Sequence, residues 1–314
     1  MKAWLFTGAH QPLERIERET PRAGADEVVV AVRAAGLCHS DVGRMDGTLT
    51  PYLPKQPPII LGHEIAGVIV EVGAGVTGYS VGDRVVASGT TDYCPGWSAD
   101  GGYASHVLLP GFSLVRLPDA VSFVQGAAAT DAGQTSHSAL VDAGELKAGE
   151  RVGIIGLGGL GMTAARLAVL YGAEVHAAEP RREAWETALA QGVTDVVEDV
   201  SALAALDLDL IVDFAGFGTT TAGAIAAVRK GGRVVQVGLG QTEATISTMT
   251  LIGKAVTLRG SGGGKPKDTA AVLNFMARGE LEIAATAIGF DAIPAGLDRL
   301  ERGGVVGRIV AEID

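Results

Sequence analysis

Residues 151–179 place two apolar strands, a glycine loop and a helix in one short run, and this order constrains the fold most. The first run, RVGIIG, is apolar throughout, which is typical of a parallel strand covered on both faces. The loop GLGGLG at 156–161, a helical stretch over 159–172 and the strand EVHAAE follow. Strands that alternate with helices in this way predict an open parallel sheet with helices on both faces.

The same alternation extends over residues 133–261. Further strand-like runs are DVVED, DLIVDFAG, GGRVVQVGLG and AVTLRGS. Helix-like segments near 182–191 and 219–229 separate some of them. We therefore predict a doubly wound, dinucleotide-binding α/β domain over residues 133–261.

The chain on either side of this domain has a different pattern. Residues 1–132 contain short apolar runs separated by Gly, Pro and Asp, which predicts a β-rich region. Its Pro-rich segment 50–60 is predicted to be a surface connection, because successive prolines deny the backbone its regular hydrogen bonds. Residues 262–314 contain an amphipathic helix, followed by a second helix, a turn and a last strand.

The glycine loop satisfies the pattern G-x-G-x-x-G through Gly156, Gly158 and Gly161. Such a pattern alone is also found in glycine-rich turns that bind nothing, but here it follows a strand, opens a helix and precedes Glu179 at the next strand end. Glu179 would accept hydrogen bonds from a ribose 2′-hydroxyl and repel a 2′-phosphate. This favours NAD over NADP, although Arg181 and the next arginine along could cover a phosphate.

Composition limits the classes of partner. A net charge of −11 with no basic run or stripe argues against a nucleic-acid partner. The apolar stretch 152–173 contains Arg166 and several glycines, so we do not expect a membrane helix. Only Cys38 and Cys94 are present, so no disulfide framework is expected, and the N-terminus lacks a signal-peptide pattern. We expect a cytoplasmic protein that acts on small molecules.

Three polar clusters precede the dinucleotide-binding domain: GLCHSD at 36–41, GHE at 62–64 and ATDAG at 129–133. Taken singly, Cys38 could be a small buried hydrophobe, His63 a core histidine and Asp131 a helix N-cap. Together they offer a thiolate, an imidazole and a carboxylate. Catalytic zinc commonly takes such a set and keeps its fourth position open.

These clusters also carry a resemblance. The stretch GHEIAGVIVEVGAGV, together with GLCHSD, VGDRVV at 81–86, the glycine loop and the terminal VGRIV, resembles the zinc-dependent alcohol dehydrogenases of the medium-chain dehydrogenase/reductase superfamily. The resemblance implies a GroES-like catalytic domain made of residues 1–132 and 262–314, and a Rossmann domain over 133–261. It further implies a homodimer or homotetramer and reversible NAD(H)-linked oxidation of a secondary alcohol, or a broad range of alcohols, to a ketone or aldehyde.

The resemblance also assigns residues around the metal. Cys38 and His63 match the first two zinc ligands, and Asp131 falls where many members have a third ligand, often Cys. Carboxylate oxygen is also a competent zinc ligand. Glu64 matches a nearby acid that approaches the metal during ligand exchange. Asp41 matches a carboxylate that orients the ligand histidine.

The proton relay and the cofactor contacts are assigned in the same way. Ser40 matches the hydroxyl that takes the proton from the alcohol. His39 is expected near a cofactor phosphate, Thr135 near the nicotinamide and Arg308 near the pyrophosphate. The full set of expected cofactor contacts is His39, Thr135, Gly156, Gly158, Gly159, Leu160, Gly161, Glu179, Arg181, Val237 and Arg308.

Two departures from the family pattern stand out. Many members bind a second, structural zinc through four closely spaced cysteines, but residues 87–103 retain only Cys94. One cysteine cannot close a structural site, so we predict a single zinc. Relatives often place a histidine three residues after the relay hydroxyl, where this chain has Gly43. The proton must therefore leave through water, ribose hydroxyls or another side chain.

Other functions remain open at this point. A zinc-free quinone or enoyl-type reductase of the same superfamily would not need the three metal donors together. A polyol or amino-alcohol dehydrogenase would share the metal chemistry, and a non-enzymatic nucleotide sensor would share only the fold. Tyr52, Trp97 and Tyr103 are candidate walls of a substrate site, with plain packing as the alternative.

Overall fold

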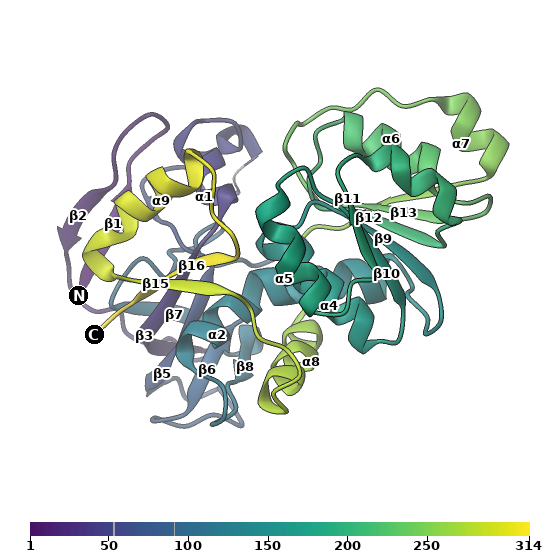
Figure 1. The fold of residues 1–314 in the computed structure, drawn as a ribbon. Helices are drawn as coiled ribbons and strands as arrows, with labels where there is room; N and C mark the ends of the chain where they lie inside the picture. Colours follow the sequence, from purple (N-terminus) through teal and green to yellow (C-terminus); the bar gives the residue numbers. More distant parts are fainter. Residues whose placement is uncertain (53, 91) are drawn as a thin grey trace. The chain divides into compact units, whose positions relative to one another are not determined.

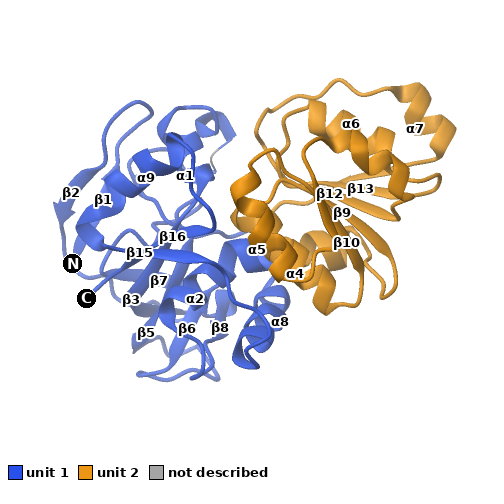
Figure 2. Ribbon diagram, in the orientation of Figure 1, with its two compact units in different colours: residues 1–134, 265–314 blue, residues 135–264 orange. Residues whose placement is uncertain are grey.

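The computed structural model describes residues 1–52, 54–90 and 92–314. The chain divides into two compact units, coloured separately in Figure 2: unit 1 contains residues 1–134 and 265–314, and unit 2 contains residues 135–264. Two predictions reach beyond the described residues. Leu53 in the Pro-rich connection and Thr91 in the short segment 87–103 lie outside them.

Unit 2 contains a six-stranded parallel sheet with the strand order β11-β10-β9-β12-β13-β14 (Figure 1). The predicted doubly wound sheet is thereby confirmed. The central strands are apolar and buried because helices connect each to the next. The strands are β9 (Arg151–Ile155), β10 (Glu174–Ala178), β11 (Asp195–Val197), β12 (Leu210–Asp213), β13 (Arg233–Gln236) and β14 (Thr257–Gly260). The helices are α4 (Gly159–Leu170), α5 (Trp185–Ala190), α6 (Thr219–Ala227) and α7 (Thr248–Lys254).

Unit 1 is built on a larger sheet with the order β15-β16-β3-β5-β6-β8, in which β7 also pairs with β3. A small sheet of order β2-β1-β4 accompanies it. The strands are β1 (Lys2–Phe6), β2 (Glu14–Glu17), β3 (Glu27–Leu37), β4 (Ile59–Ile60), β5 (Glu64–Val72), β6 (Arg84–Ala87), β7 (His106–Pro110), β8 (Leu114–Arg116), β15 (Ala285–Gly289) and β16 (Arg308–Glu312). The helices are α1 (His39–Met45), α2 (Phe123–Ala128), α8 (Pro266–Ala277) and α9 (Ile293–Glu301).

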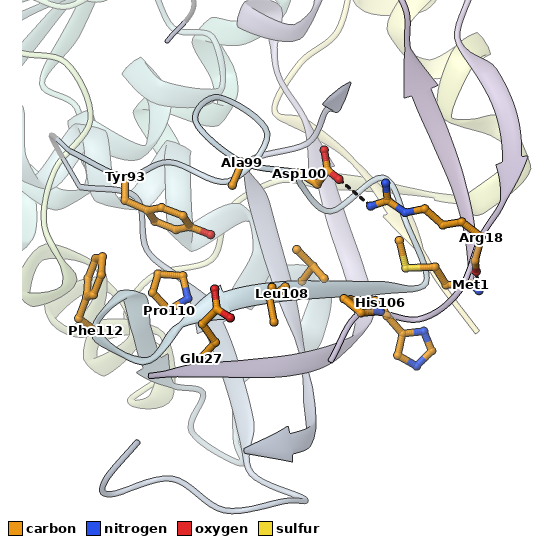
Figure 3. Close-up of a pocket in the computed structure, with 12 residues that line it drawn as sticks. Met1, Arg18, Glu27, Tyr93, Ala99, Asp100, His106, Leu108, Pro110 and Phe112 are labelled. Atoms are coloured by element: carbon orange, nitrogen blue, oxygen red, sulfur yellow. Dashed lines mark hydrogen bonds and ion pairs between the residues drawn. The ribbon is translucent and has the colours of Figure 1, made fainter. Parts of the chain in front are cut away.

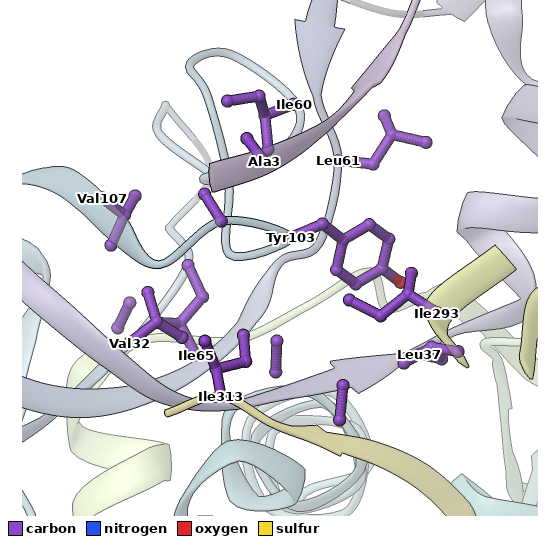
Figure 4. Packing of buried hydrophobic residues seen from close by; sticks show 14 of the residues in the cluster. Ala3, Val32, Leu37, Ile60, Leu61, Ile65, Tyr103, Val107, Ile293 and Ile313 are labelled. Atoms are coloured by element: carbon purple, nitrogen blue, oxygen red, sulfur yellow. The ribbon is translucent and has the colours of Figure 1, made fainter. Parts of the chain in front are cut away.

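The core of unit 1 gathers apolar side chains from both sheets and from α9 (Figure 4). Leu37, Ile60, Ile65 and Ile293 are almost fully buried, and the ring of Tyr103 lies among them. Strand β3 is buried along most of its length, and its alternate residues Val28, Val30 and Val32 contribute to this core. The core fixes the ends of β3 and β5, where the polar clusters of the sequence lie.

Some elements differ from the sequence-based expectation. Ile59 and Ile60, at the end of the predicted surface connection, are buried and form β4. The region after residue 123 is one helical run in which α2 continues through a π-helical turn, Ala129–Gly133, into α3 (Gln134–Ser138). Asp131 is therefore inside a helix and does not cap one. Strand β15 and helix α7 were not predicted, since their exposed residues give no clear apolar period.

Candidate functional site

Three elements of unit 1 bring the predicted metal donors together. Cys38 follows β3 and precedes α1, His63 precedes β5, and Asp131 lies in the π-helical turn. The Cys38 thiol donates to Asp131 Oδ2 at 3.3 Å, and His63 Nε2 lies 3.8 Å from the same oxygen. With Glu64, these residues offer ligand atoms that all lie within 4.8 Å of one another. Within the described residues, this is the one cluster of His, Cys and acidic donors close enough to hold a metal ion.

Arg308 lies at this same cluster. It begins β16 and is buried, and its Nη2 donates to Asp131 Oδ2 at 2.8 Å. The same nitrogen pairs with Glu64 Oε1. One buried guanidinium thus faces both carboxylates through the same nitrogen and offsets part of their negative charge. The sequence did not predict this contact. The expected contact of Arg308 with a pyrophosphate stays a prediction.

Asp41 lies behind His63, on the side away from Asp131. Its Oδ1 is 3.6 Å from His63 Nδ1, whereas His63 Nε2 faces Asp131. Asp41 Oδ2 accepts hydrogen bonds from the Tyr103 hydroxyl at 2.8 Å and from Cys38 N at 3.3 Å. The carboxylate can therefore hold the imidazole so that Nε2 points at the donor cluster, which is how acids orient metal-binding histidines.

The electrostatics of the cluster favour a cation. Burial lowers the pKa of His63, but Asp41, Asp131 and Cys38 together raise that pKa well above its ordinary value. Burial raises the pKa of Asp41, yet His63 and Arg44 outweigh it, so the pKa of Asp41 is below its ordinary value. His63 Nδ1 and Asp41 Oδ1 are both buried and face each other at 3.6 Å, and neither has a closer partner among the described residues. Donors of these types, in an acidic and buried setting, fit a zinc ion.

The neighbours of the metal donors on α1 differ in exposure. Ser40 is half-buried and His39 is exposed. At Gly43, an added Cβ would lie 3.0 Å from two side-chain carbons of Leu49. Leu49 N also donates to Gly43 O at 2.6 Å, so Leu49 is held against this turn. Leu49 thus occupies the space into which a side chain at position 43 would extend.

Cys94 is not part of the cluster. Burial raises the pKa of its thiol to about 11, so the thiol is protonated and a poor metal ligand at neutral pH. Its backbone closes a tight turn, in which Trp97 N and Ser98 N both donate to Cys94 O. The short segment around it is therefore built from hydrogen bonds, and the described residues nearby offer no second cysteine.

The glycine loop of unit 2 has the geometry that phosphate binding needs. Gly156 has φ +85° and joins β9 to the loop. A Cβ at Gly161 would lie 1.7 Å from Gly156 O, so only glycine permits this close packing of helix and strand. A Cβ at Gly158 would meet nothing within 4 Å, and no side chain caps the N-terminus of α4 there. The open space and the helix N-terminus suit a pyrophosphate.

Glu179 follows β10 and is held in place from two directions. Its Oε2 accepts from Leu157 N at 2.7 Å, which ties it to the glycine loop. Its two oxygens also accept from Arg181 N, Nε and Nη2 at 2.9–3.0 Å. Burial raises the pKa of Glu179, but the hydrogen bonds from Arg181 and Leu157 lower it below its ordinary value. Glu179 is therefore a fixed anion, as ribose recognition requires.

The remaining predicted cofactor residues also lie in unit 2. Thr135 is buried in α3, and the next residue, Ser136, donates to Leu160 O at 2.8 Å. Val237 follows β13, and its N donates to Asp213 O at 3.0 Å. The sequence analysis missed Asp213, which is fully buried and whose side chain accepts bonds from Ala215 N, Gly216 N, Thr220 and Thr221. The sequence feature that could have indicated Asp213 is its place as an acidic residue at the end of the apolar strand DLIVD.

A cavity of about 380 Å³ lies elsewhere in unit 1 (Figure 3). It is lined mainly by apolar side chains such as Leu108 and Phe112, with the Arg18–Asp100 ion pair at one side. None of the predicted metal or cofactor residues lines it. Across the described part of the chain, every helix is too short or too polar to cross a membrane.

The comparisons with known proteins agree with this geometry. The model of the alcohol dehydrogenase GroES-like domain matches residues 24–119, and that of the zinc-binding dehydrogenases matches residues 159–278. An alcohol dehydrogenase of Geobacillus stearothermophilus is 35% identical over 340 residues, with 100% of both chains covered. An NAD-dependent alcohol dehydrogenase of Sulfolobus acidocaldarius is 28% identical, again over 100% of both chains.

Solved structures resemble the whole chain as well. The alcohol dehydrogenase of Aeropyrum pernix has a TM-score of 0.91 at 29% identity, covering 99% of this chain and 100% of that one. The acetophenone reductase of Geotrichum candidum, solved with NAD, has a TM-score of 0.89 at 26% identity, covering 99% of this chain and 96% of that one.

We expect Tyr103→Phe to destabilise the protein by about 1–3 kcal/mol, because it removes the shorter of two hydrogen bonds to Oδ2 of the fully buried Asp41 carboxylate and leaves only that from Cys38 N. Tyr79→Phe is the matched control, since the Tyr79 hydroxyl donates to the carbonyl of Leu114 at a half-buried position. Chemical unfolding of both variants measures the difference. Equal losses of unfolding free energy would show that the bond to Asp41 has no special weight.

Proposed function

Because the chain belongs to the alcohol dehydrogenases of the medium-chain dehydrogenase/reductase superfamily, we propose that it oxidises an alcohol to a ketone or aldehyde with NAD and one zinc ion. The observation that carries the proposal is the donor cluster of Cys38, His63 and Asp131, with Glu64 beside it. A zinc-free reductase would have no use for three such donors within 4.8 Å. The acetophenone reductase, whose fold the chain shares, supports a secondary alcohol as substrate.

The metal would be held by Cys38, His63 and Asp131. When bound, zinc supplies a Lewis acid that lowers the pKa of an alcohol. Asp41, itself held by Tyr103, keeps His63 Nε2 turned toward the cluster. Arg308 balances the charges of Asp131 and Glu64. Glu64 is near enough to assist when alcohol and water exchange.

The reaction removes one proton and one hydride from the substrate. We propose that Ser40, next to His39 on α1, accepts the proton from the alcohol oxygen. A bound NAD⁺ would supply the hydride acceptor, so that alcohol and NAD⁺ would become a carbonyl compound, NADH and a proton. Thr135 is proposed to position the nicotinamide, and His39 to lie near a phosphate.

The cofactor would bind at the glycine loop, from Gly156 to Gly161. The space at Gly158 and the backbone of Gly159 and Leu160 suit the pyrophosphate. Glu179 favours the free 2′-hydroxyl of NAD. The relative from Sulfolobus acidocaldarius, which is named an NAD-dependent alcohol dehydrogenase, supports NAD as the cofactor. Arg181 is engaged by Glu179 and so is less available to a 2′-phosphate.

For the metal, we expect Asp131→Ala to weaken zinc binding by more than about 100-fold and to abolish alcohol oxidation, since it removes a ligand outright. Cys94→Ala is the matched control and should keep one zinc per chain. Metal analysis after dialysis, with circular dichroism to verify the fold, measures both. If the folded Asp131→Ala protein retains its zinc, the third ligand is another residue.

For the cofactor, Glu179→Ala should lower the preference for NADH over NADPH by about tenfold or more, because it removes the repelling carboxylate and releases Arg181. Equilibrium titration by cofactor fluorescence gives the two dissociation constants. Glu186→Ala changes a nearby exposed acid and serves as the control. A wild-type protein that prefers NADPH would contradict the assignment of Glu179.

We also propose a homo-oligomer formed through the β14 edge of the unit 2 sheet. All four residues of β14 are exposed at the end of the sheet, and a free edge strand offers unpaired backbone groups to a second copy. Nearby, Met249 and Ile252 on α7 are 79% and 76% exposed. Sedimentation should give a mass above 32.0 kDa, and Ile252→Lys should lower it. A wild-type monomer would contradict this proposal.

A further inference from the structure

Arg44 is a buried arginine that no predicted function uses. It lies on α1, three residues after Asp41, and none of its surface is exposed. Its Nη1 donates to the carbonyl of Gly96, whereas Nε and Nη2 have no hydrogen-bond partner. Arginine is rarely buried to this extent, and an incompletely bonded guanidinium is costly. The Asp41 carboxylate attracts the guanidinium, and a further contact is made with an aromatic ring.

That contact is with Trp97. The central carbon of the buried Arg44 guanidinium lies 3.7 Å from the centroid of the indole ring, which is a close cation–π contact. Arg44 thus engages two consecutive residues, the carbonyl of Gly96 and the ring of Trp97. Contacts on both the backbone and the ring leave the indole little freedom to rotate.

Trp97 also contacts a residue of the metal cluster. The rings of Trp97 and His63 have centroids 6.5 Å apart at an interplanar angle of 69°, an edge-on contact. Trp97 is partly exposed, whereas His63 is 8% exposed. The indole therefore contacts both a buried cation and a proposed zinc ligand, and part of its surface is exposed.

The segment that carries Trp97 is packed directly on the backbone before His63. Gly101 N donates to Ile60 O at 2.8 Å, and Gly102 N to Gly62 O at 2.7 Å. A Cβ at Gly96 would come within 3.0 Å of the Gly62 backbone. This segment occupies the place of the four-cysteine lobe in many members of the superfamily, and here Arg44 and hydrogen bonds hold it.

We propose that Arg44 is a positioning residue that clamps Trp97 beside His63, and that Trp97 is the wall that limits the size of the alcohol admitted to the metal. The inference rests on the proposed function. An alcohol oxygen at the open metal position lies close to His63, so its carbon substituents must pass the indole. Small aliphatic alcohols fit beside a fixed ring, while branched and aryl alcohols meet it.

The first test compares kcat/KM for 1-phenylethanol with that for 2-propanol. Trp97→Ala should raise this ratio by about tenfold or more, because it removes the obstructing ring. Arg44→Met should shift the ratio in the same direction, since the released indole can move aside. Trp97→Phe keeps an aromatic ring and Arg44→Lys keeps a positive charge. Both variants should give ratios between those of Trp97→Ala or Arg44→Met and that of the wild type.

Arg116→Met is the matched control. It removes another guanidinium from an aromatic ring, that of Tyr79 at 5.1 Å, and should leave the ratio unchanged. If Arg44→Met does not fold, the Trp97 variants and Arg44→Lys still decide the matter. A ratio that Trp97→Ala and Arg44→Lys both leave at the wild-type value overturns the inference.

A second measurement does not depend on turnover. In a protein with Trp4→Phe and Trp185→Phe, only Trp97 emits, and Co²⁺ added to the zinc-free protein should quench it because the ring lies next to His63. Arg44→Met in this background should reduce the quenching and shift the emission to the red. Identical emission and quenching in both proteins would overturn the clamp.

The outcomes separate the two proposals. Bound Co²⁺ and 2-propanol oxidation, with an unmoved substrate ratio, would refute the role of Trp97 and leave the proposed function standing. Absence of both metal binding and alcohol oxidation would refute the proposed function, and the proposed role of Trp97 would be refuted as well.

Discussion

The antiparallel pairing of β3 with β5 and β16 is the constraint on which the site depends. In this register Gly36 faces Glu64 across one edge of β3, and Leu37 faces Ile309 across the other. Residues that are far apart in the sequence therefore meet where β3 ends. Gly36 is required there, since a Cβ would lie 2.1 Å from Glu64 Oε2. A slip of one residue would turn these side chains to the opposite face and disperse the cluster.

The charges gathered at this point explain why an aspartate is workable as the third donor. Asp131 Oδ2 faces Cys38 and His63 and also accepts from Arg308. A carboxylate that is mostly buried, as that of Asp131 is, needs such a partner, or its charge would be costly. A carboxylate offers several lone pairs, so it can accept from a guanidinium and still serve a metal. A cysteine at position 131 would form a weaker bond with Arg308.

The sequence predicted those features that depend on residues close together in the chain, and it missed contacts between distant segments. The order of strand, glycine loop and helix predicted the parallel sheet, because the apolar spacing of each strand and helix can be recognised within a few consecutive residues. The donors Cys38, His63 and Asp131 could be proposed only as a set, and their proximity depends on strand register and on a π-helical turn. Arg308 was expected at a pyrophosphate, yet in the structure it pairs with two acids of the cluster. The contacts of Arg44 could not be predicted from the sequence, since its partners Gly96 and Trp97 lie in a distant segment of the chain.

Packing around position 43 is compatible with the glycine that stands there in place of the histidine of many relatives. A histidine there would need Leu49 to move, because Leu49 fills the space and its backbone is bonded to Gly43. Restoring the histidine alone would therefore crowd the turn after α1 before it could serve as a relay. The proton that Ser40 is proposed to accept must leave by another route. Ribose hydroxyls of the bound cofactor and ordered water are chemically suited to this transfer, since each both donates and accepts hydrogen bonds.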